Sequence, residues 1–150
     1  MDANANDPGG LYPFFTCSKE TLSINSYAFD GEAILIAGNG DIGHAKYYSG
    51  KFNAYQRTYV LMNFKANALF VKMTIDRYLP AKILEETQGG AMPYIKLATL
   101  SSLQIPCPPK LKQREIVKQY RSIDKKLENE ISYAKLLQQQ KAYLLNAMFI

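Results

Sequence analysis

The C-terminal quarter of the chain constrains its fold more than any other part. Residues 112–149 contain neither glycine nor proline and are rich in Lys, Gln, Glu, Leu and Ala. Apolar residues recur through them at steps of three, four or seven, which is typical of one long amphipathic helix. At 1.5 Å per residue such a helix extends roughly 55 Å. This is longer than a domain of about 110 residues is wide, so part of its apolar stripe needs another surface.

A second helix is the surface that such a stripe fits best, and we expect the two helices to pair as a coiled coil. The alternative is a helix that folds back on its own domain, which the prolines before it would permit for the first turns only. The sequence has no internal repeat, so the second helix would come from another chain or from a segment outside this sequence. We expect the interface to comprise Ile116, Tyr120, Ile123, Leu127, Ile131, Ala134, Leu137 and Leu144.

The residues before this helix have the pattern of a small α+β domain. Residues 1–10 lack an apolar period and end in Pro-Gly-Gly, so we expect a flexible segment. Short strands are predicted at residues 12–16, 28–31, 33–37, 45–48 and 59–62, with a turn at Ser49-Gly50. Residues 66–88 have a helical composition that Pro80 interrupts, which predicts two short helices. Residues 94–105 read as a strand and a turn before Pro106.

The predicted fold is therefore α+β: a globular domain with a mixed sheet over residues 11–109, and one long helix over residues 110–150. No run of about 18 apolar residues is present, so a membrane span is not expected. The polar N-terminus does not resemble a secretory signal. Two cysteines and one histidine form neither a disulfide framework nor a conventional zinc site. These features predict a cytoplasmic protein without a bound metal.

Gly38, Gly40 and Gly43 follow an apolar strand and match the spacing of a dinucleotide-binding loop. The context does not fit, because the residues after the loop read as a strand and no acidic residue lies about 20 positions further on. His44 stands where a phosphate-binding loop would have its lysine. Two interpretations remain open: a turn between strands, or a loop whose backbone approaches a phosphate or a base. We expect no catalytic residue, because neither cysteine has a partner in a recognisable arrangement.

The charge distribution favours binding to a polyanion. Residues 44–82 hold seven basic residues and one acidic residue, and residues 110–150 hold nine and four. From His44 to Thr58, basic and aromatic residues alternate with no acidic residue among them. Lys and Arg suit phosphates, whereas Gln, Asn and Thr can contact base edges. Charge alone is equally compatible with lysines that only solvate a surface, and at least half of the aromatic residues are expected in the core.

Several segments together resemble one known family. They are GLYPFFTCSKE (10–20), AFDGEAILIAGNGDIGHAKYYSGKFNAYQRTYVL (28–61), GGAMPYIKLATLSSLQIPCPPKLKQREIV (89–117), IDKK (123–126) and AYLLNAMF (142–149). In order and spacing they are similar to the DNA specificity subunit of type I restriction-modification systems. The resemblance implies a noncatalytic target recognition domain followed by a conserved spacer helix. A complete subunit has two of each, and each recognition domain reads half of a bipartite DNA site.

The resemblance also implies partners. Methyltransferase subunits use S-adenosylmethionine to methylate adenine, and motor subunits for restriction hydrolyse ATP, so this chain itself needs no cofactor. One recognition domain with one helix is half the usual complement, which predicts either a fragment or a half-subunit that forms a homodimer. Twofold symmetry would make the target of such a dimer a palindrome of two half-sites.

We expect the contacts with double-stranded DNA to fall into three groups. Lys46, Lys51, Arg57 and Lys96 would contact the backbone, and Gly89-Gly90 would allow a loop to approach it. The residues expected to read bases are Asn39, Asp41, His44, Tyr47, Gln56 and Thr58. Two other functions remain open: an interaction protein whose helix docks on a partner without DNA binding, and a small enzyme that holds a nucleotide at the glycine loop.

Overall fold

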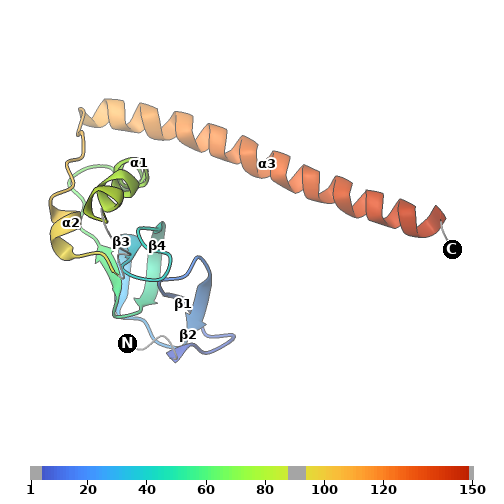
Figure 1. The fold of residues 1–150 in the computed structure, drawn as a ribbon, viewed down its shortest axis with the longest axis horizontal. Helices are drawn as coiled ribbons and strands as arrows, with labels where there is room; N and C mark the ends of the chain where they lie inside the picture. Colours follow the sequence, from blue (N-terminus) through green and yellow to red (C-terminus); the bar gives the residue numbers. More distant parts are fainter. Residues whose placement is uncertain (1–4, 88–93, 149–150) are drawn as a thin grey trace. The chain divides into compact units, whose positions relative to one another are not determined.

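A computed structural model describes residues 5–87 and 94–148 of the chain (Figure 1). The chain divides into two compact units, residues 1–110 and residues 111–150. The first unit is a sheet with two helices, and the second consists of most of one long helix. This α+β class with a long C-terminal helix is the predicted one.

The sheet of the first unit has five strands. They are β1 (Tyr12–Phe15), β2 (Thr21–Ile24), β3 (Phe29–Ala37), β4 (Ala45–Ala54) and β5 (Thr58–Leu61). Their order across the sheet is β2-β1-β4-β3-β5. All neighbours are antiparallel except β1 and β4, which pair in parallel through Phe14↔Asn53 and Phe15↔Ala54. The sheet is therefore mixed, as the spacing of its strands and turns predicted.

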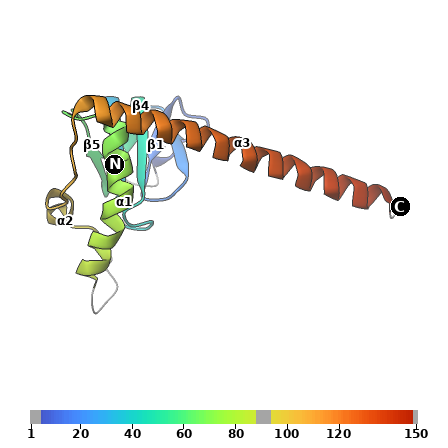
Figure 2. The same ribbon diagram turned by 90° about the horizontal axis from the view of Figure 1, so that it is seen from above.

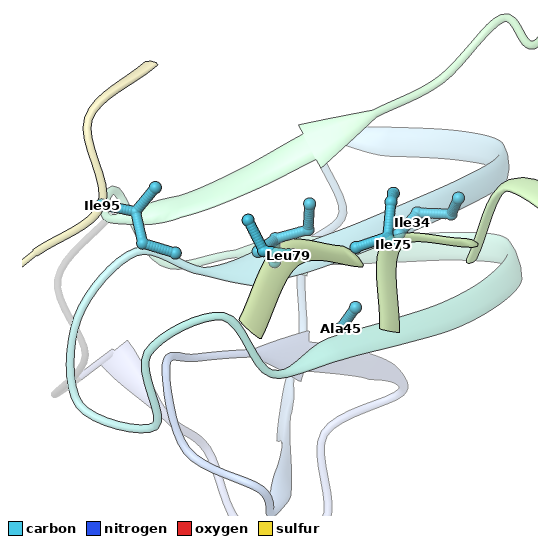
Figure 3. Close-up of a cluster of buried hydrophobic side chains, with 6 residues drawn as sticks. Ile34, Ala45, Ile75, Leu79 and Ile95 are labelled. Atoms are coloured by element: carbon cyan, nitrogen blue, oxygen red, sulfur yellow. The ribbon is translucent and has the colours of Figure 1, made fainter. Parts of the chain in front are cut away.

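Strand β3 lies at the centre of two hydrophobic clusters. Side chains alternate between the faces of a strand, and residues 33–37 are buried throughout. Ile34 and Ile36 pack with Ile75, Leu79 and Ile95 on one face of the sheet, and Figure 3 shows this cluster. On the other face, Ala33 and Leu35 pack in a second cluster with Phe15, Phe52 and Ala54. Because both faces of β3 are covered by hydrophobic clusters, residues 33–37 form a continuous apolar run, AILIA.

Helix α1 (Ala68–Glu86) covers the face of the sheet that carries the first cluster (Figures 1 and 2). The side chain of Asn67 caps its N-terminus by accepting a 3.0 Å hydrogen bond from the Phe70 N–H. Pro80 lies inside this helix, so the prediction of two helices broken at Pro80 is wrong. The carbonyl of Asp76 loses its helical donor, but both residues are exposed and water can satisfy it. Burial of Ile75 and Leu79 offsets the rest of the cost.

Two other local predictions are wrong, and one strand was not predicted. Residues 94–105 contain a short helix, α2 (Leu97–Ser101), rather than a strand. Strand β4 runs through Ser49-Gly50 without a turn, because Gly50 pairs with Gly31 of β3. Both glycines adopt a positive φ, 134° at Gly50 and 131° at Gly31, which allows the two paired strands to bend together. Strand β2 was not anticipated, because the polar residues around it mask its short pattern. The remaining predicted strands are present, with residues 28–31 and 33–37 joined in β3.

The second unit is formed by helix α3 (Lys110–Met148), which runs without interruption for 39 residues (Figure 2). The long helix predicted from the C-terminal pattern is thereby confirmed. None of the helices in residues 5–87 and 94–148 combines the length and the apolar character needed to cross a bilayer. Residues 121–148 of α3 are all exposed, apolar positions included.

The packing of α1 predicts the effect of shortening one buried leucine. Leu79 is fully buried, so Leu79→Ala should lower the free energy of unfolding by about 2–5 kcal/mol because it leaves a cavity. Leu84→Ala is the matched control on the same helix, since Leu84 is 72% exposed and should change stability by less than about 0.5 kcal/mol. Urea denaturation followed by circular dichroism measures both. Equal losses from the two variants would contradict this packing.

Candidate nucleic-acid interface

The glycine loop between β3 and β4 is a tight turn held by its own backbone. The N–H of Gly43 donates to the carbonyl of Ala37 at 3.0 Å, and the N–H of Ala37 donates to the carbonyl of His44 at 3.0 Å. The N–H of His44 in turn donates to the carbonyl of Asp41 at 3.0 Å. These bonds continue the β3–β4 hairpin to its tip and place His44 on the surface.

The three glycines of this loop are required by neighbouring atoms of the protein itself. A Cβ at Gly38 would overlap the carbonyl oxygen of Arg57. At Gly43, where φ is +78°, it would lie 2.6 Å from the Ile83 Cδ1. At Gly40, where φ is +61°, it would lie 3.0 Å from the Cys17 carbonyl oxygen. Of the two interpretations of the motif, the turn between strands is the one observed, with close approaches to the protein's own atoms.

The β4–β5 turn (residues 55–57) lies against this glycine loop. The carbonyl of Arg57 accepts two hydrogen bonds, from the N–H of Gly38 at 3.0 Å and from the thiol of Cys17 at 3.3 Å. The N–H of Tyr55 donates to the carbonyl of Phe15 at 2.8 Å. The turn is thereby joined to β1 and to the glycine loop, while the side chains of Gln56 and Arg57 are exposed.

A cleft of about 420 Å³ opens beside this turn. Its lining includes Gln56, Arg57, Tyr59, Tyr94 and Ile95. Two hydrogen bonds of 2.7 Å join these segments: the N–H of Ile95 donates to the carbonyl of Gly38, and the hydroxyl of Tyr59 donates to the carbonyl of Ile95. The lining thus combines an amide and a guanidinium with buried Ile95 and the half-exposed ring of Tyr94.

Three of the residues predicted to contact DNA use their polar groups within the protein. The Nζ of Lys46 donates to the carbonyl of Glu20 at 2.8 Å and to the hydroxyl of Thr21 at 3.3 Å. Partial burial lowers the pKa of Lys46, and Asp41 and Glu20 oppose this with smaller effects. The hydroxyl of Tyr47 donates to the Glu32 carboxylate at 2.6 Å.

Thr58 is the third of these residues. Its half-buried hydroxyl lies 3.5 Å from the carbonyl of Phe15, to which it donates, and 3.7 Å from the Cys17 thiol. The Asp41 carboxylate is also engaged, because it accepts a 2.8 Å hydrogen bond from the N–H of Lys19. Asn39 is half-buried at the start of the loop, whereas His44 lines a second cleft of about 390 Å³ with Asp41 and Lys19.

The remaining predicted residues do not gather at the turn. Lys51 pairs with Asp30, at the end of the β3–β4 ladder remote from the glycine loop. Its Nζ lies 4.6 Å from the centre of the Tyr27 ring, and hydrogen bonding with Tyr27, helped by Tyr12 and Asp30, raises the pKa of Lys51. Gly89 and Gly90 lie outside the described residues.

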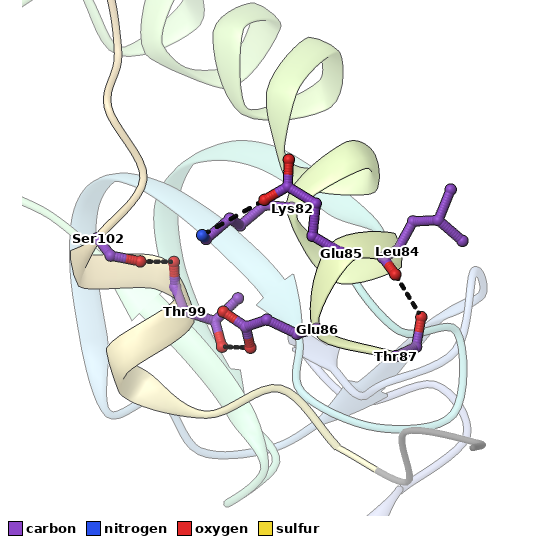
Figure 4. Close-up of polar contacts among 7 residues, drawn as sticks. All are labelled: Lys82, Leu84, Glu85, Glu86, Thr87, Thr99 and Ser102. Atoms are coloured by element: carbon purple, nitrogen blue, oxygen red, sulfur yellow. Dashed lines mark hydrogen bonds and ion pairs between the residues drawn. The ribbon is translucent and has the colours of Figure 1, made fainter. Parts of the chain in front are cut away.

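Lys96 precedes α2, where it borders a third cleft near the end of α1. There the hydroxyl of buried Thr99 donates to the Glu86 carboxylate at 2.6 Å, and the hydroxyl of Ser102 donates to the Thr99 carbonyl at 3.2 Å (Figure 4). Glu85 forms an exposed ion pair with Lys82 at 3.5 Å. Glu86 therefore links α1 to α2.

Sequence reasoning missed two residues of this region, Cys17 and Tyr94. The thiol of Cys17 donates to the carbonyl of Arg57, 40 positions further along the chain, and no local sequence pattern predicts such a hydrogen bond. Tyr94 begins residues 94–105, which were predicted as a strand and a turn with no part in the site. Its pairing with the cleft depends on the bonds that Ile95 makes with Gly38 and Tyr59.

The pairing residues predicted on α3 lie along one side of the helix. Leu127, Ile131 and Leu144 have half or more of their surface exposed. Ile123, Ala134 and Leu137 are also exposed, whereas Ile116 and Tyr120 are half-buried. The helix thus presents an apolar stripe to solvent over most of its length.

Comparisons with known proteins agree with the resemblance. The family model described as "Type I restriction modification DNA specificity domain" matches residues 1–137. The type I restriction enzyme EcoDI specificity subunit of Escherichia coli is 43% identical over 108 residues, which are 72% of this chain and 24% of that protein. The chain thus spans about a quarter of the length of this curated relative.

A solved structure has a similar fold. It is the crystal structure of a type I restriction-modification S subunit from M. genitalium, with a TM-score of 0.66 and 17% sequence identity. The similarity covers 86% of this chain and 36% of that one. At this sequence identity the similarity shows a shared fold and nothing further.

The contact between Gly38 and Arg57 predicts a specific sensitivity. Gly38→Ala would force the Arg57 carbonyl away and should lower the free energy of unfolding by about 1–3 kcal/mol. Asn39→Ala, one residue further on, adds no atom near that carbonyl and should cost less than about 0.5 kcal/mol. Thermal unfolding of the two variants measures the difference. A Gly38→Ala variant as stable as the wild type would contradict the close contact between Gly38 and the Arg57 carbonyl oxygen.

Proposed function

The chain belongs to the family of type I restriction-modification DNA specificity domains, and we propose that it reads one half of a bipartite DNA target as the noncatalytic specificity component of such a system. The observation that carries this proposal is the match of the family model, which extends from the sheet unit well into α3. A relative at 43% identity supports the same role. Methylation and cleavage would belong to partner subunits that use S-adenosylmethionine and ATP.

The DNA contacts come from the exposed members of the predicted set. Gln56, Arg57 and His44 are exposed around the glycine loop and the β4–β5 turn, and Lys51 and Lys96 are exposed elsewhere on the same unit. Lys and Arg bind phosphates and release counterions, which supplies affinity. Lys46, Tyr47 and Thr58 support this surface from within, because their polar groups are bonded to Glu20, Glu32 and Phe15. Asn39, Asp41, Gly89 and Gly90 complete the proposed set.

Helix α3 is the proposed spacer and dimerisation element. Its exposed apolar stripe is of the kind that a second helix covers in a coiled coil. A homodimer with twofold symmetry would present two copies of the recognition unit to a palindromic target. The methyltransferase subunits, and the motor subunits for restriction, are the proposed partners of this assembly, which would act in the cytoplasm.

The first test is binding of duplex DNA by the chain together with its methyltransferase subunit. The logarithm of the binding constant should fall linearly with the logarithm of salt concentration, with a slope of about −0.9 for each phosphate contacted. Fluorescence anisotropy across a salt series measures it. A complex that retains no duplex at low salt would reject the proposal and favour the second candidate, an interaction protein that acts through the stripe of α3 alone.

The second test concerns the oligomeric state. Leu127→Lys or Ile131→Lys places a charge in the apolar stripe, and light scattering should then report a mass near 16.9 kDa in place of twice that value. Ser132→Lys is the control: it adds the same charge about 140° around the helix from Leu127 and should leave the dimer intact. A wild-type chain that is monomeric at all concentrations would contradict self-pairing.

A further inference from the structure

The backbone of the β4–β5 turn is held by hydrogen bonds at both of its ends. Its first residue, Tyr55, donates to the Phe15 carbonyl and its last, Arg57, accepts from Gly38 and Cys17. The N–H of Thr58 closes the turn with a 2.9 Å bond to the Tyr55 carbonyl. Base reading depends on hydrogen bonds with fixed directions, so a side chain on an anchored turn loses less freedom on binding than one on a mobile loop.

The two side chains that this turn exposes are suited to reading bases. An arginine can form a bidentate pair with O6 and N7 of guanine, and a glutamine can form one with N6 and N7 of adenine. Gln56 and Arg57 both line the 420 Å³ cleft, and Tyr94 and Ile95 line it too. The hydroxyl of Tyr59 fixes Ile95, the neighbour of Tyr94, by donating to its carbonyl. The backbone that carries the exposed pair and the backbone beside Tyr94 are therefore both held by hydrogen bonds within the protein.

Lys51 is placed differently from these two residues. It lies at the end of the β3–β4 ladder that is remote from the glycine loop, with its ammonium over the Tyr27 ring. A lysine is a point charge without a planar fork, and it suits a phosphate more than a base edge. Lys51, which suits phosphate binding, therefore lies apart from Gln56 and Arg57, which line the cleft.

We propose that Gln56 and Arg57 are the specificity-determining residues of this unit, and that together with Tyr94, which lines the same cleft, they read the purines of one or two adjacent base pairs. Lys51 contributes affinity without sequence preference. This inference rests on the DNA-reading function proposed above and assigns the reading to one turn among all the candidate residues.

The experiment is a selection of duplexes with randomised sequence by the full chain in complex with its methyltransferase subunit. Wild type, Arg57→Ala, Gln56→Ala and Lys51→Ala are compared. Each alanine variant at the turn should lose the base preference at one position of the enriched sequence, by about 5- to 150-fold, and keep the other positions. Lys51→Ala should weaken all sequences alike and reduce the salt slope by about one.

The outcomes separate this inference from the function on which it rests. If the wild-type complex enriches no sequence, the proposed function fails and the inference fails with it. If the wild type enriches a site and both turn variants enrich the same site with unchanged preferences, the inference alone is overturned. Thermal unfolding of each variant is measured in parallel. Because both side chains are exposed, the midpoints should match the wild type, so a lost preference reflects lost reading.

Discussion

The carbonyl group of Arg57 is the point on which the sheet unit depends. It accepts hydrogen bonds from the glycine loop, through Gly38, and from the end of β1, through the thiol of Cys17. Backbone polar groups that leave water must find partners, and here one acceptor satisfies donors from two distant segments. The junction thus ties the start of β5 to β1, although β4 and β3 lie between them in the sheet. The cleft beside the turn depends in addition on the bonds that Ile95 makes with Gly38 and Tyr59.

Close contacts within the protein also explain why the loop that matches the spacing of a dinucleotide-binding motif contains glycines. Each of the three positions faces an atom of the protein that a side chain would displace. The two-sided burial of β3 adds a second constraint, because α1 must pack on Ile34 and Ile36 while the aromatic cluster fills the opposite face. The packing of α1 is strong enough to keep Pro80 inside a single helix.

The sequence predicted the elements whose signals are local and periodic. The long helix, most strands and the α+β class could be read from spacing, and the family from the order of several segments. Pro80 was predicted to break the helix, but it lies on the exposed side of α1, where water can bind the carbonyl group that loses its donor. Ser49-Gly50 was predicted as a turn, but Gly50 pairs with Gly31, a second glycine, and the strand continues. In the candidate site, the alternation of basic and aromatic residues selected Lys46 and Tyr47, but that pattern carries no information about Glu20 or Glu32 as their partners. Contacts across tens of residues, such as Cys17 with Arg57, depend on the assembled sheet.

The chemistry of the junction also bears on how such a protein changes over evolutionary time. The bonds that hold the β4–β5 turn are made by main-chain atoms and by the thiol of Cys17, which follows β1, and none of them uses the side chain at position 56 or 57. Replacement of those two side chains therefore leaves the scaffold and its stability largely untouched. The residues at these two positions can thus change from one generation to another without a period of poor folding.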